Sequence, residues 1–487
     1  MNGNIWVTMH FSALAGLFLY GLHRIWILIN WHREKKKKSP AAYTPSFYTL
    51  QEVPLITVQL PLYNERFVAV RILDAAANLE WPVDRLEIQI LDDSTDDTRK
   101  IVDNRAAYWI CKGVNMRVIR REVREGYKAG ALNRGLEQAG GEFIAIFDAD
   151  FLPADDFLKR TIPYFSDTKT GMVQAKWGFV NAEHSWFTRI QSLLLGQHFT
   201  IEHFTRFRKG LFFNFNGTAG IWRREAIESA GGWKPDTVTE DLDLSYRAEL
   251  AGWRFVYLDD LVVPSELPVT MASFRSQQQR WAKGSIQTAK KILPHLFASD
   301  LPFSVKCEAA AHLLSNVCWL LAAVVTLTLY ATITWRITIG PYQMLRVDLP
   351  LFLGTSFLMF LYFFIYAVKQ KGDKYFCSLF MLPVLSIGIA PVIALSVLRG
   401  IFEKGGNFQR TPKFGIRGKE RLTGLASVYR QKSIPYLIMN TCLLIYSILP
   451  LIFAFERETW AAMPFLFIFP LGFSLAIAGD FRELIRQ

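Results

Sequence analysis

The chain is poor in cysteine: it has five among 487 residues, and no two of them form a Cys-x-x-Cys pair. This scarcity excludes a disulfide framework and a cysteine-rich zinc site. The chain also has no internal repeat, and its one low-complexity tract is Lys35 to Lys38, which excludes a repeat architecture. The cysteines lie mostly in apolar stretches, where a thiol acts as a small hydrophobe, at Cys111, Cys307, Cys318, Cys377 and Cys442.

Charge is also scarce, because only 20% of the residues are charged, against 51% hydrophobic and 14% aromatic. A chain of this length can hold a large charged domain together with apolar helices. The net charge is +12, and Lys and Arg cluster beside apolar segments, as the positive-inside rule predicts. We therefore expect anionic lipid and a small anionic ligand as partners, and no nucleic acid.

Six apolar stretches are long enough to cross the ~30 Å hydrocarbon core of a bilayer. The first covers residues 5–30 and is followed by Arg33 and by Lys35 to Lys38. Because the positive cluster follows the stretch, we predict an uncleaved signal anchor over 1–34 with its C-terminal side in the cytoplasm. The others, in a predicted membrane domain over 305–487, lie at 310–335, 350–368, 376–398, 434–455 and 462–479.

The stretch 376–398 is predicted not to cross the membrane. It lies between the lysine-bearing loop 369–374 and the basic loop 399–433, both expected in the cytoplasm. A helix between two cytoplasmic loops cannot cross, and Pro383 and Pro391 interrupt this one. We predict an interfacial or re-entrant segment and five spans; the alternative is a true span with the basic loop outside. The outer loops are then short, at 336–349 and 456–461.

Residues 52–290 have the pattern of a cytoplasmic α/β domain. Apolar strand-like runs alternate with helical patterns, which implies a mostly parallel sheet with helices on both faces. In such sheets ligands bind beyond the carboxyl ends of the strands. Asp92 and Asp93 end one run and Asp148 and Asp150 follow another, so we expect these carboxylates to share a site. The runs are 55–60, 86–91, 116–119 and 142–147.

Asp148 and Asp150 place two carboxylates at positions i and i+2 after a strand. A divalent cation that bridges a diphosphate needs hard oxygen ligands and open positions for phosphate, and it stabilises the leaving diphosphate as a Lewis acid. We predict Mg²⁺ or Mn²⁺ here; the alternative is a solvated turn. For Asp92 and Asp93 the alternative is helix capping. Lys128, which lies two residues after Gly126 and before a predicted helix, is suited to phosphate oxygens.

Three further strings are ambiguous when each is taken alone. Gln277, Arg280 and Trp281 lie on one face of a helix; the arginine suits a diphosphate and the indole a sugar ring, but a helix at the lipid boundary has the same pattern. Asp241 precedes a helical pattern that it can cap. The run 408–413 follows Gly405-Gly406 and has the composition of an ordinary basic juxtamembrane loop.

Together these strings resemble those of processive, membrane-embedded family 2 glycosyltransferases such as cellulose synthase. The resemblance covers residues 53–291, with the run 408–413 beyond it. It implies a GT-A fold, inverting transfer and a β-1,4-linked hexose product. Longer runs resemble the plant mannan synthase (CslA) and glucan synthase (CslC) branch, at 78–82, 91–95, 127–132, 215–223 and 230–233.

The resemblance also implies roles for individual residues. Asp241 is the general base that accepts the proton of the acceptor hydroxyl. The donor nucleotide and its diphosphate are bound by Asp92, Asp93, Lys128, Asp148 and Arg280. The acceptor is bound by Asn216, Gly217, Gln277 and Trp281. A gating loop closes over bound nucleotide and contains Phe408, Thr411 and Lys413.

Two departures from the family pattern are present. Arg410 stands where valine is usual in the gating loop. No PilZ-like domain follows the last predicted span, so control by cyclic-di-GMP through such a domain is not expected.

The leading hypothesis is a synthase that takes UDP-glucose or GDP-mannose, extends a polysaccharide acceptor and passes it through its own helices. Candidate stacking residues are Trp281, Trp319 and Trp335. The expected location is the cytoplasmic (inner) membrane, or the Golgi membrane in a eukaryote, and an accessory secretion subunit is a candidate partner. One alternative is transfer of a single sugar to a membrane lipid. Another is a non-catalytic channel, against which the intact carboxylates argue.

Overall fold

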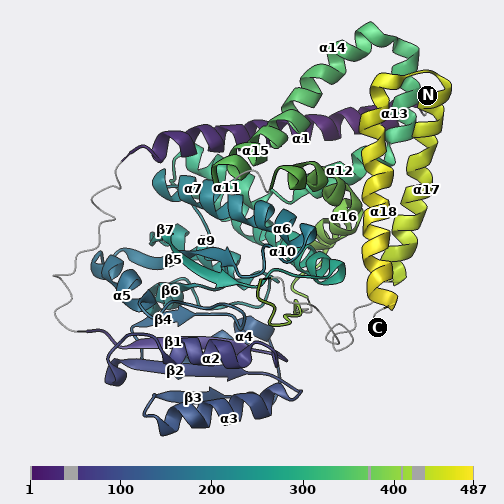
Figure 1. The fold of residues 1–487 in the computed structure, drawn as a ribbon. Helices are drawn as coiled ribbons and strands as arrows, with labels where there is room; N and C mark the ends of the chain where they lie inside the picture. The colour runs from purple at the N-terminus through teal and green to yellow at the C-terminus, as the bar shows by residue number, and fades with distance from the viewer. Residues whose placement is uncertain (1–2, 38–52, 371–374, 407–409, 419–433, 486–487) are drawn as a thin grey trace.

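The computed structural model describes residues 3–37, 53–370, 375–406, 410–418 and 434–485. Figure 1 shows two parts: a domain built on a sheet, within residues 53–298, and a set of long helices formed by residues 3–34 and 303–485. Both ends of the described chain belong to the helical part. Along the sequence, the sheet domain therefore lies between the two segments that form the helical part.

A seven-stranded sheet forms the centre of the first part, in the order β3-β2-β1-β4-β6-β5-β7. Strand β6 is antiparallel to both of its neighbours, and the remaining pairs are parallel. The predicted mostly parallel sheet is therefore confirmed. The strands are β1 (Ile56–Leu62), β2 (Leu86–Asp92), β3 (Met116–Ile119), β4 (Phe143–Ile146), β5 (Thr170–Phe179), β6 (Gly220–Arg223) and β7 (Arg254–Ser265).

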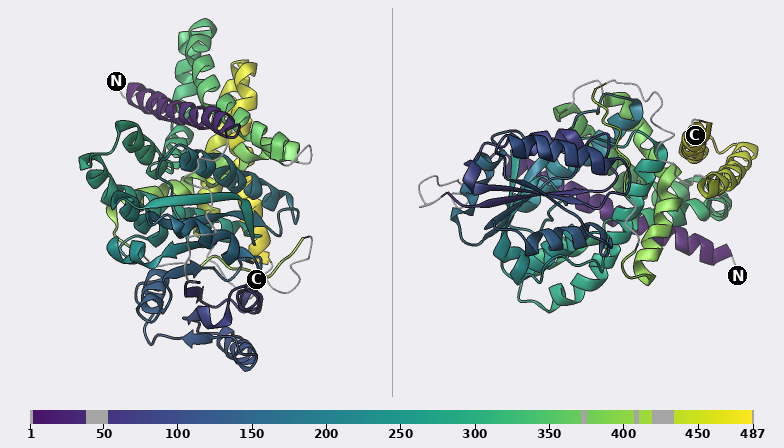
Figure 2. Two further views of the ribbon diagram at one scale, coloured as in Figure 1. Left: turned by 90° about the vertical axis from the view of Figure 1, so that its left-hand side faces the viewer. Right: turned by 90° about the horizontal axis from the view of Figure 1, so that it is seen from below.

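Helices cover the sheet on both faces (Figure 2, right). All residues of β2 and β4 are buried, as expected for central strands covered on two sides. The helices of this part are α2 (Ala69–Ala77), α3 (Thr98–Cys111), α4 (Tyr127–Glu137), α5 (Phe157–Thr161), α6 (Trp186–Gln197), α7 (Phe204–Arg208), α8 (Arg224–Ser229), α9 (Glu240–Leu250) and α10 (Met271–Ala298).

Helix α10 joins the two parts of the molecule. Its Phe274 and Ile286 pack against Ile389 and Ile393 of α16 (Phe376–Phe402) in one buried cluster. The Arg275 guanidinium, on the same helix, forms a buried ion pair with Asp480 of α18 (Met463–Ile485), at 2.7 Å. The position of α10 is thus fixed from the membrane-helix side as well as from the sheet side.

The predicted span 310–335 is wrong as a single helix. The structure has three helices there: α11 (Phe303–Leu313), α12 (Val317–Leu327), which is bent by 56° from α11, and α13 (Leu329–Ile339). The break contains Ser315 and Asn316, and the Asn316 amide donates to Ser285 Oγ of α10 at 2.8 Å. Short polar side chains such as these form hydrogen bonds that compete with those of the helix backbone. Hydropathy alone does not reveal such a break.

Within the described residues, five helices are long and apolar enough to cross a membrane, and the bent pair of α11 and α12 would make a sixth if it forms one span. The five are α1 (Gly3–Glu34), the continuous segment Tyr342–Val368, α16, α17 (Ile434–Glu456) and the segment Trp460–Ile485, which contains α18. Helix α16 differs from the others because 56% of its apolar window is buried, against 22–28% in the other four. That burial reflects its packing against α10, α12 and α18, and α16 is one continuous helix. Whether it spans stays a prediction.

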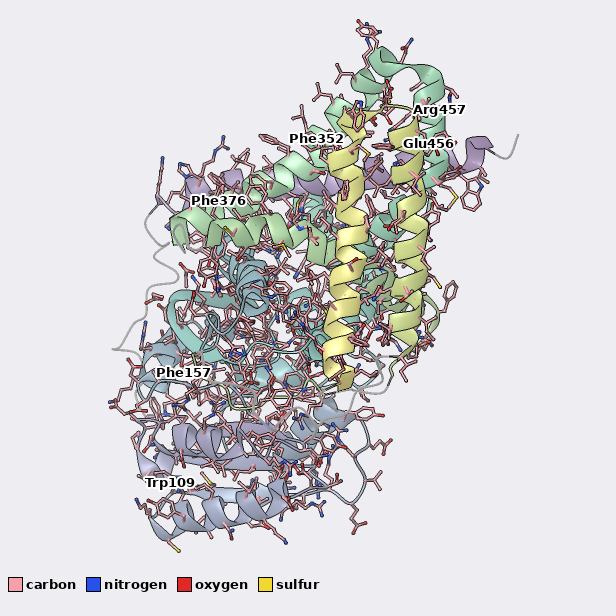
Figure 3. All side chains as sticks on the ribbon, turned by 45° about the vertical axis from the view of Figure 1, so that its right-hand side comes forward. Trp109, Phe157, Phe352, Phe376, Glu456 and Arg457 are labelled. Atoms are coloured by element: carbon pink, nitrogen blue, oxygen red, sulfur yellow. The ribbon has the colours of Figure 1, made fainter. Side chains whose placement is uncertain are left out.

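The arrangement of the helices bears on the predicted topology. Figure 3 shows Glu456 and Arg457, at the turn between α17 and α18, far from Trp109 and Phe157 of the sheet domain, as expected for an outer loop. Figure 1 shows α1 crosswise to α17 and α18, so these helices do not share one spanning direction. The predicted signal anchor therefore stays a prediction.

Candidate active site

A pocket of about 1140 Å³, partly open to solvent, lies at the carboxyl ends of β1, β2, β4, β5 and β7. This volume includes the open space at the mouth of the pocket. Residues that are distant in the chain meet in it, because α9, α10 and the segment 410–418 close its sides. The predicted site residues that line it are Asp93, Lys128, Asp148, Asp150, Asn216, Gly217, Asp241, Gln277, Arg280, Trp281, Thr411 and Lys413.

Asp92 does not line the pocket, unlike its neighbour Asp93. Its side chain is fully buried; one carboxylate oxygen accepts from Ser94 N at 3.0 Å and the other pairs with Arg120 at 2.8 Å. The prediction that Asp92 contacts the nucleotide directly is thus replaced by a role in holding the turn after β2. Phe408 lies outside the described residues.

Tyr63 and Arg124 form the end of the pocket nearest to β1 and β2. The Arg124 guanidinium carbon lies 3.5 Å from the centroid of the Tyr63 ring. Asp93 accepts from Arg121 Nε at 3.0 Å and lies 3.8 Å from Arg124. Flat cationic and aromatic groups beside a carboxylate are suited to a nucleobase. The sequence reasoning missed Tyr63 and Arg124.

The two carboxylates of the Asp-Ala-Asp string each face a lysine. Asp148 lies 2.6 Å from Lys128 Nζ, and Asp150 lies 2.7 Å from Lys413 Nζ. Among the described residues, no group of three or more His, Cys, Asp or Glu side chains could hold a metal ion by itself. Two hard oxygen donors in an open pocket still fit a divalent cation whose other ligands come from a diphosphate and water.

Glu65 is a pocket residue that the sequence reasoning did not single out. Burial raises the pKa of its carboxyl to about 8, against the opposing effect of Arg410, whose Nε lies 3.0 Å away. Its Oε2 has no hydrogen-bond partner in the described parts of the chain. Tyr63 and Glu65 follow β1 as Asp93 follows β2, so the rule about strand ends would have found both.

The segment 410–415 packs over the pocket through Glu266. The Glu266 carboxylate accepts from the backbone N–H groups of Phe414 and Gly415, both at 2.9 Å, and Lys413 donates to its carbonyl oxygen. Glu266 is buried and was missed from sequence, because its role depends on a segment almost 150 residues later. The segment is thereby held against the second carboxylate of the Asp-Ala-Asp string.

Asp241 occupies the first turn of α9, where its Oδ1 accepts from Leu242 N at 2.8 Å. The cap position of α9 is Thr239, so Asp241 is not the cap residue, although it binds a backbone N–H of the first turn and lines the pocket. Burial raises the pKa of Asp241, against the charge of Lys128; burial and then the Asp241 charge raise the pKa of Glu240 to about 7. A base with a raised pKa accepts a proton more readily near neutral pH, so the pair suits proton abstraction.

The loop after η4 (His198–His203) and α7 carries Asn216 and Gly217 against these groups. Asn216 Nδ2 lies 2.9 Å from His203 Nε2, and Lys128 Nζ donates to Gly217 O at 2.8 Å. Three predicted residues from distant segments, Lys128, Gly217 and Asp241, are thus neighbours. Gln277, Arg280 and Trp281 of α10 line the opposite side.

Comparison with known families identifies the domain that holds this pocket. Its sequence matches the family described as glycosyltransferase like family 2, over residues 54–284. These residues form a family 2 glycosyltransferase domain. The site carboxylates and α10 up to residue 284 lie inside this range.

Relatives of the glycosyltransferase domain include plant proteins. The chain is 44% identical over 295 residues to glucomannan 4-β-mannosyltransferase 2 of Arabidopsis thaliana, covering 59% of this chain and 55% of the relative. It is 47% identical over 247 residues to glucomannan 4-β-mannosyltransferase 1 of Cyamopsis tetragonoloba, covering 50% and 47%. The chain thus spans about half the length of these curated relatives. The predicted resemblance to the plant mannan synthase branch is confirmed.

A solved structure supports the fold. The mannosyltransferase PcManGT from Pyrobaculum calidifontis, in complex with GDP-Man and Mn²⁺, covers 80% of this chain and 99% of its own, with a TM-score of 0.53 and 21% identity. At this identity the likeness concerns the fold alone. The predicted GT-A fold of the glycosyltransferase domain is confirmed.

Two of the predicted stacking residues do not reach the pocket of the glycosyltransferase domain. Trp335 of α13 packs against Phe11 of α1, with ring centroids 5.3 Å apart, and Trp319 packs on the cluster between α10 and α16. Only Trp281 of the three lines the pocket. The other two pack against neighbouring helices, and whether they contact a glycan within the helical part stays a prediction.

Gly217→Ala tests the neighbourhood of Gly217 and Asp241. Gly217 has a φ of +78°, and a Cβ there would lie 2.8 Å from Asp241 Oδ2, so the alanine should displace the carboxylate. We expect sugar incorporation to fall by about 100-fold, as for a misplaced catalytic group. Gly210→Ala is the matched control, because its φ is +63° but no atom lies within 4 Å of its Cβ. An equal loss of sugar incorporation in both variants would show that backbone strain, and not displacement of the Asp241 carboxylate, causes the effect.

Proposed function

We propose that this protein transfers a hexose, with inversion, from a nucleotide sugar to the end of a growing β-1,4-linked glycan. The observation that carries the proposal is the arrangement of the pocket. Asp241 and Lys128 both lie beside Gly217, while the donor-side carboxylates and Trp281 line the same space. The relatives named glucomannan 4-β-mannosyltransferase support the reaction and the linkage.

GDP-mannose is the first donor to test, and UDP-glucose is the second. The names of the plant relatives and the GDP-Man complex of the structural neighbour favour mannose. In the pocket, Tyr63, Asp93 and Arg124 would hold the nucleobase. Lys128 and Arg280 would face the diphosphate. Both cations lie close enough to Asp241, the proposed general base, to lower the pKa of its carboxyl.

Asp148 and Asp150 would hold Mg²⁺ or Mn²⁺, and the Mn²⁺ complex of the structural neighbour supports this assignment. The ion, when bound, neutralises charge on the leaving diphosphate. Lys128 and Lys413 already neutralise these carboxylates at 2.6 and 2.7 Å. Donor binding would therefore let both lysines turn from the carboxylates to phosphate oxygens.

Asp241 would accept the proton of the acceptor hydroxyl as that oxygen attacks the sugar carbon. Trp281 would support the acceptor sugar with its indole face. Thr411 and Lys413, in a segment held by Glu266, would cover the donor and exclude water; closure of this segment as a gate stays part of the proposal. Together these positions favour transfer to the glycan over hydrolysis.

The five apolar helices support a membrane protein. We propose that the glycosyltransferase domain faces the cytoplasm and that the product passes the membrane through the helical part. The predicted bacterial inner membrane and accessory secretion subunit receive no support from the plant relatives. The second candidate function is transfer of one sugar to a lipid, favoured by the contact of α10 with the apolar helix α16.

Radiolabel incorporation by the purified protein in lipid vesicles tests the proposal. GDP-mannose and UDP-glucose are offered separately, each with Mg²⁺ or Mn²⁺, and the product is digested with linkage-specific glycanases. We expect a high-mass product from GDP-mannose that a β-1,4-mannanase degrades. A lipid carrying one sugar would establish the second candidate, and no product from either donor would contradict the proposed reaction.

Trp281→Ala should reduce chain extension by about tenfold more than donor hydrolysis, because the indole supports the acceptor and not the attacking water. Product length is read on gels, and hydrolysis is read as free hexose. Trp109→Ala, a partly buried tryptophan packed on the far side of the sheet domain, is the control. An equal loss of extension and hydrolysis in Trp281→Ala would point to misfolding.

A further inference from the structure

The π-helical turn η4 (His198–His203) contacts the loop that carries Asn216. π-Helices are rare, and they often occur at functional sites. The last residue of this turn, His203, is fully buried and does not line the pocket. Its ring packs against the rings of Phe199 and Phe213, with centroids 5.4 and 5.5 Å away. The His203 ring is therefore held firmly just outside the pocket.

Buried ion pairs with other helices fix the turn. Glu202, on the turn itself, pairs with Arg24 of α1 and with Arg206 of α7. Arg206 in turn pairs with Glu308 of α11 at 3.0 Å. All four side chains are buried, and removal of one partner from a buried pair is costly. The helical part of the molecule thus holds the turn against the loop of the sheet domain.

The orientation of the Asn216 carboxamide follows from its neighbours. Asn214 Nδ2 donates to the backbone carbonyl of Phe215 at 2.8 Å. A carbonyl oxygen can only accept, so the orientation of the Asn214 amide is fixed. Asn214 Nδ2 also lies 3.4 Å from Asn216 Oδ1, which places the oxygen of Asn216 on that side. The nitrogen, Asn216 Nδ2, is therefore the atom that lies 2.9 Å from His203 Nε2.

The His203 ring accepts this hydrogen bond at the expense of others. Burial, with the charges of His198 and Arg206, lowers the pKa of His203 well below its usual range, so the ring is neutral. Because Nε2 accepts from Asn216, the ring hydrogen lies on Nδ1, which has no hydrogen-bond partner among the described residues. Nε2 also lies 3.1 Å from Asn214 O, to which it cannot donate in this tautomer. Such unsatisfied buried groups are rare in native proteins and call for an explanation.

We propose that His203 is a positioning residue, which holds the Asn216 amide nitrogen and so directs the amide oxygen to a hydroxyl of the acceptor sugar. Asn216 is half-buried and lines the pocket next to Gly217. An amide oxygen has two lone pairs, and its 3.4 Å contact with Asn214 Nδ2 is a weak hydrogen bond. The oxygen can therefore accept from a sugar hydroxyl. This inference rests on the proposed function and adds a residue outside the pocket to acceptor recognition.

The test is a double-mutant cycle that is read on the acceptor KM. The full-length protein in lipid vesicles receives GDP-mannose and a β-1,4-linked manno-oligosaccharide, and transfer and donor hydrolysis are measured separately. His203→Phe keeps an aromatic ring but cannot accept the hydrogen bond. The acceptor KM should therefore rise by about tenfold, the order expected for one hydrogen bond, while the donor KM for hydrolysis should stay unchanged.

Two further variants separate positioning from a merely structural role. In the Asn216→Ala background, His203→Phe should have no further effect on the acceptor KM, because the amide that it orients is gone. His203→Gln, whose side-chain oxygen can accept in place of Nε2, should restore most of the wild-type acceptor KM. His10→Phe is the matched control, because His10 is buried and bonded to Thr328 at 2.9 Å but does not line the pocket.

An unchanged acceptor KM in His203→Phe would overturn the role of His203, and so would an equal rise in the wild-type and Asn216→Ala backgrounds. If His203→Phe does not fold, His203→Leu takes its place with the same expected result. A lack of transfer by wild type would overturn the proposed function, and this role with it. Transfer by wild type with no effect of the His203 variants would overturn the positioning role alone.

Discussion

Asp241→Asn should lower hexose transfer by about 10³-fold while leaving the affinity for the nucleotide sugar unchanged. Asparagine has nearly the same shape as aspartate, but its amide cannot accept the proton of the acceptor hydroxyl. The half-buried Asp241 carboxylate lies beside Gly217, and its Oδ1 also accepts from Leu242 N at 2.8 Å. The amide oxygen can keep that hydrogen bond, so the start of α9 should remain folded.

The measurement pairs radiolabel incorporation with calorimetric binding of GDP-mannose. Asp236→Asn is the control on the same segment, because Asp236 is half exposed and its carboxylate pairs with Lys291 at 2.7 Å. In wild type, transfer should also decline as the pH is lowered through the raised pKa values of the Glu240 and Asp241 pair, since the base must be ionised. Undiminished turnover by Asp241→Asn would refute the base assignment.

Asp150→Asn should lower metal-dependent donor binding by at least about 100-fold, and a chelator should abolish transfer by wild type. The Asp150 carboxylate accepts from Lys413 Nζ at 2.7 Å and from Glu266 N at 3.0 Å. The variant therefore removes one proposed ligand and also leaves Lys413 without its counter-charge. Donor affinity is measured by calorimetry with and without Mn²⁺.

Asp155→Asn, an exposed carboxylate five residues further along the same loop, should behave as wild type. One result would contradict the proposed metal site. Lys128 and Lys413 each contact a carboxylate of the Asp-Ala-Asp string, so these two lysines could neutralise the diphosphate themselves. Full transfer in the presence of a chelator would show that they do, and the metal site would then be abandoned.

The order of strands and helices in the glycosyltransferase domain was predictable because its signals are local. The run 116–119 coincides with β3, and the run 86–91 differs from β2 by one residue. Buried parallel strands need continuous apolar residues, and polar residues must follow where the chain leaves the sheet. The same reasoning places Asp93, Asp148 and Asp150 at one edge of the sheet, where all three line the pocket.

The choice between Asp92 and Asp93 shows where local reasoning ends. Asp92 is the last residue of β2, and Asp93 is the first residue after it. Which of the two carboxylates faces the pocket depends on the path of the chain beyond the strand and on the side chains that surround it. The structure buries Asp92 on Arg120 and turns Asp93 to the pocket. The match of a short motif to a family pattern cannot show which of two adjacent residues faces the pocket.

The sequence by itself determined the α/β class, the sheet edge that carries the carboxylates, and the presence of several long apolar helices, because hydrophobic runs and strand ends are properties of neighbouring residues. Only the tertiary structure decided that Glu266 and Trp177 join the pocket and that 310–335 is broken at Asn316. It also brought Lys413 to Asp150 across 263 residues. These features depend on contacts between segments that are distant in the chain, and no periodicity in either segment encodes them.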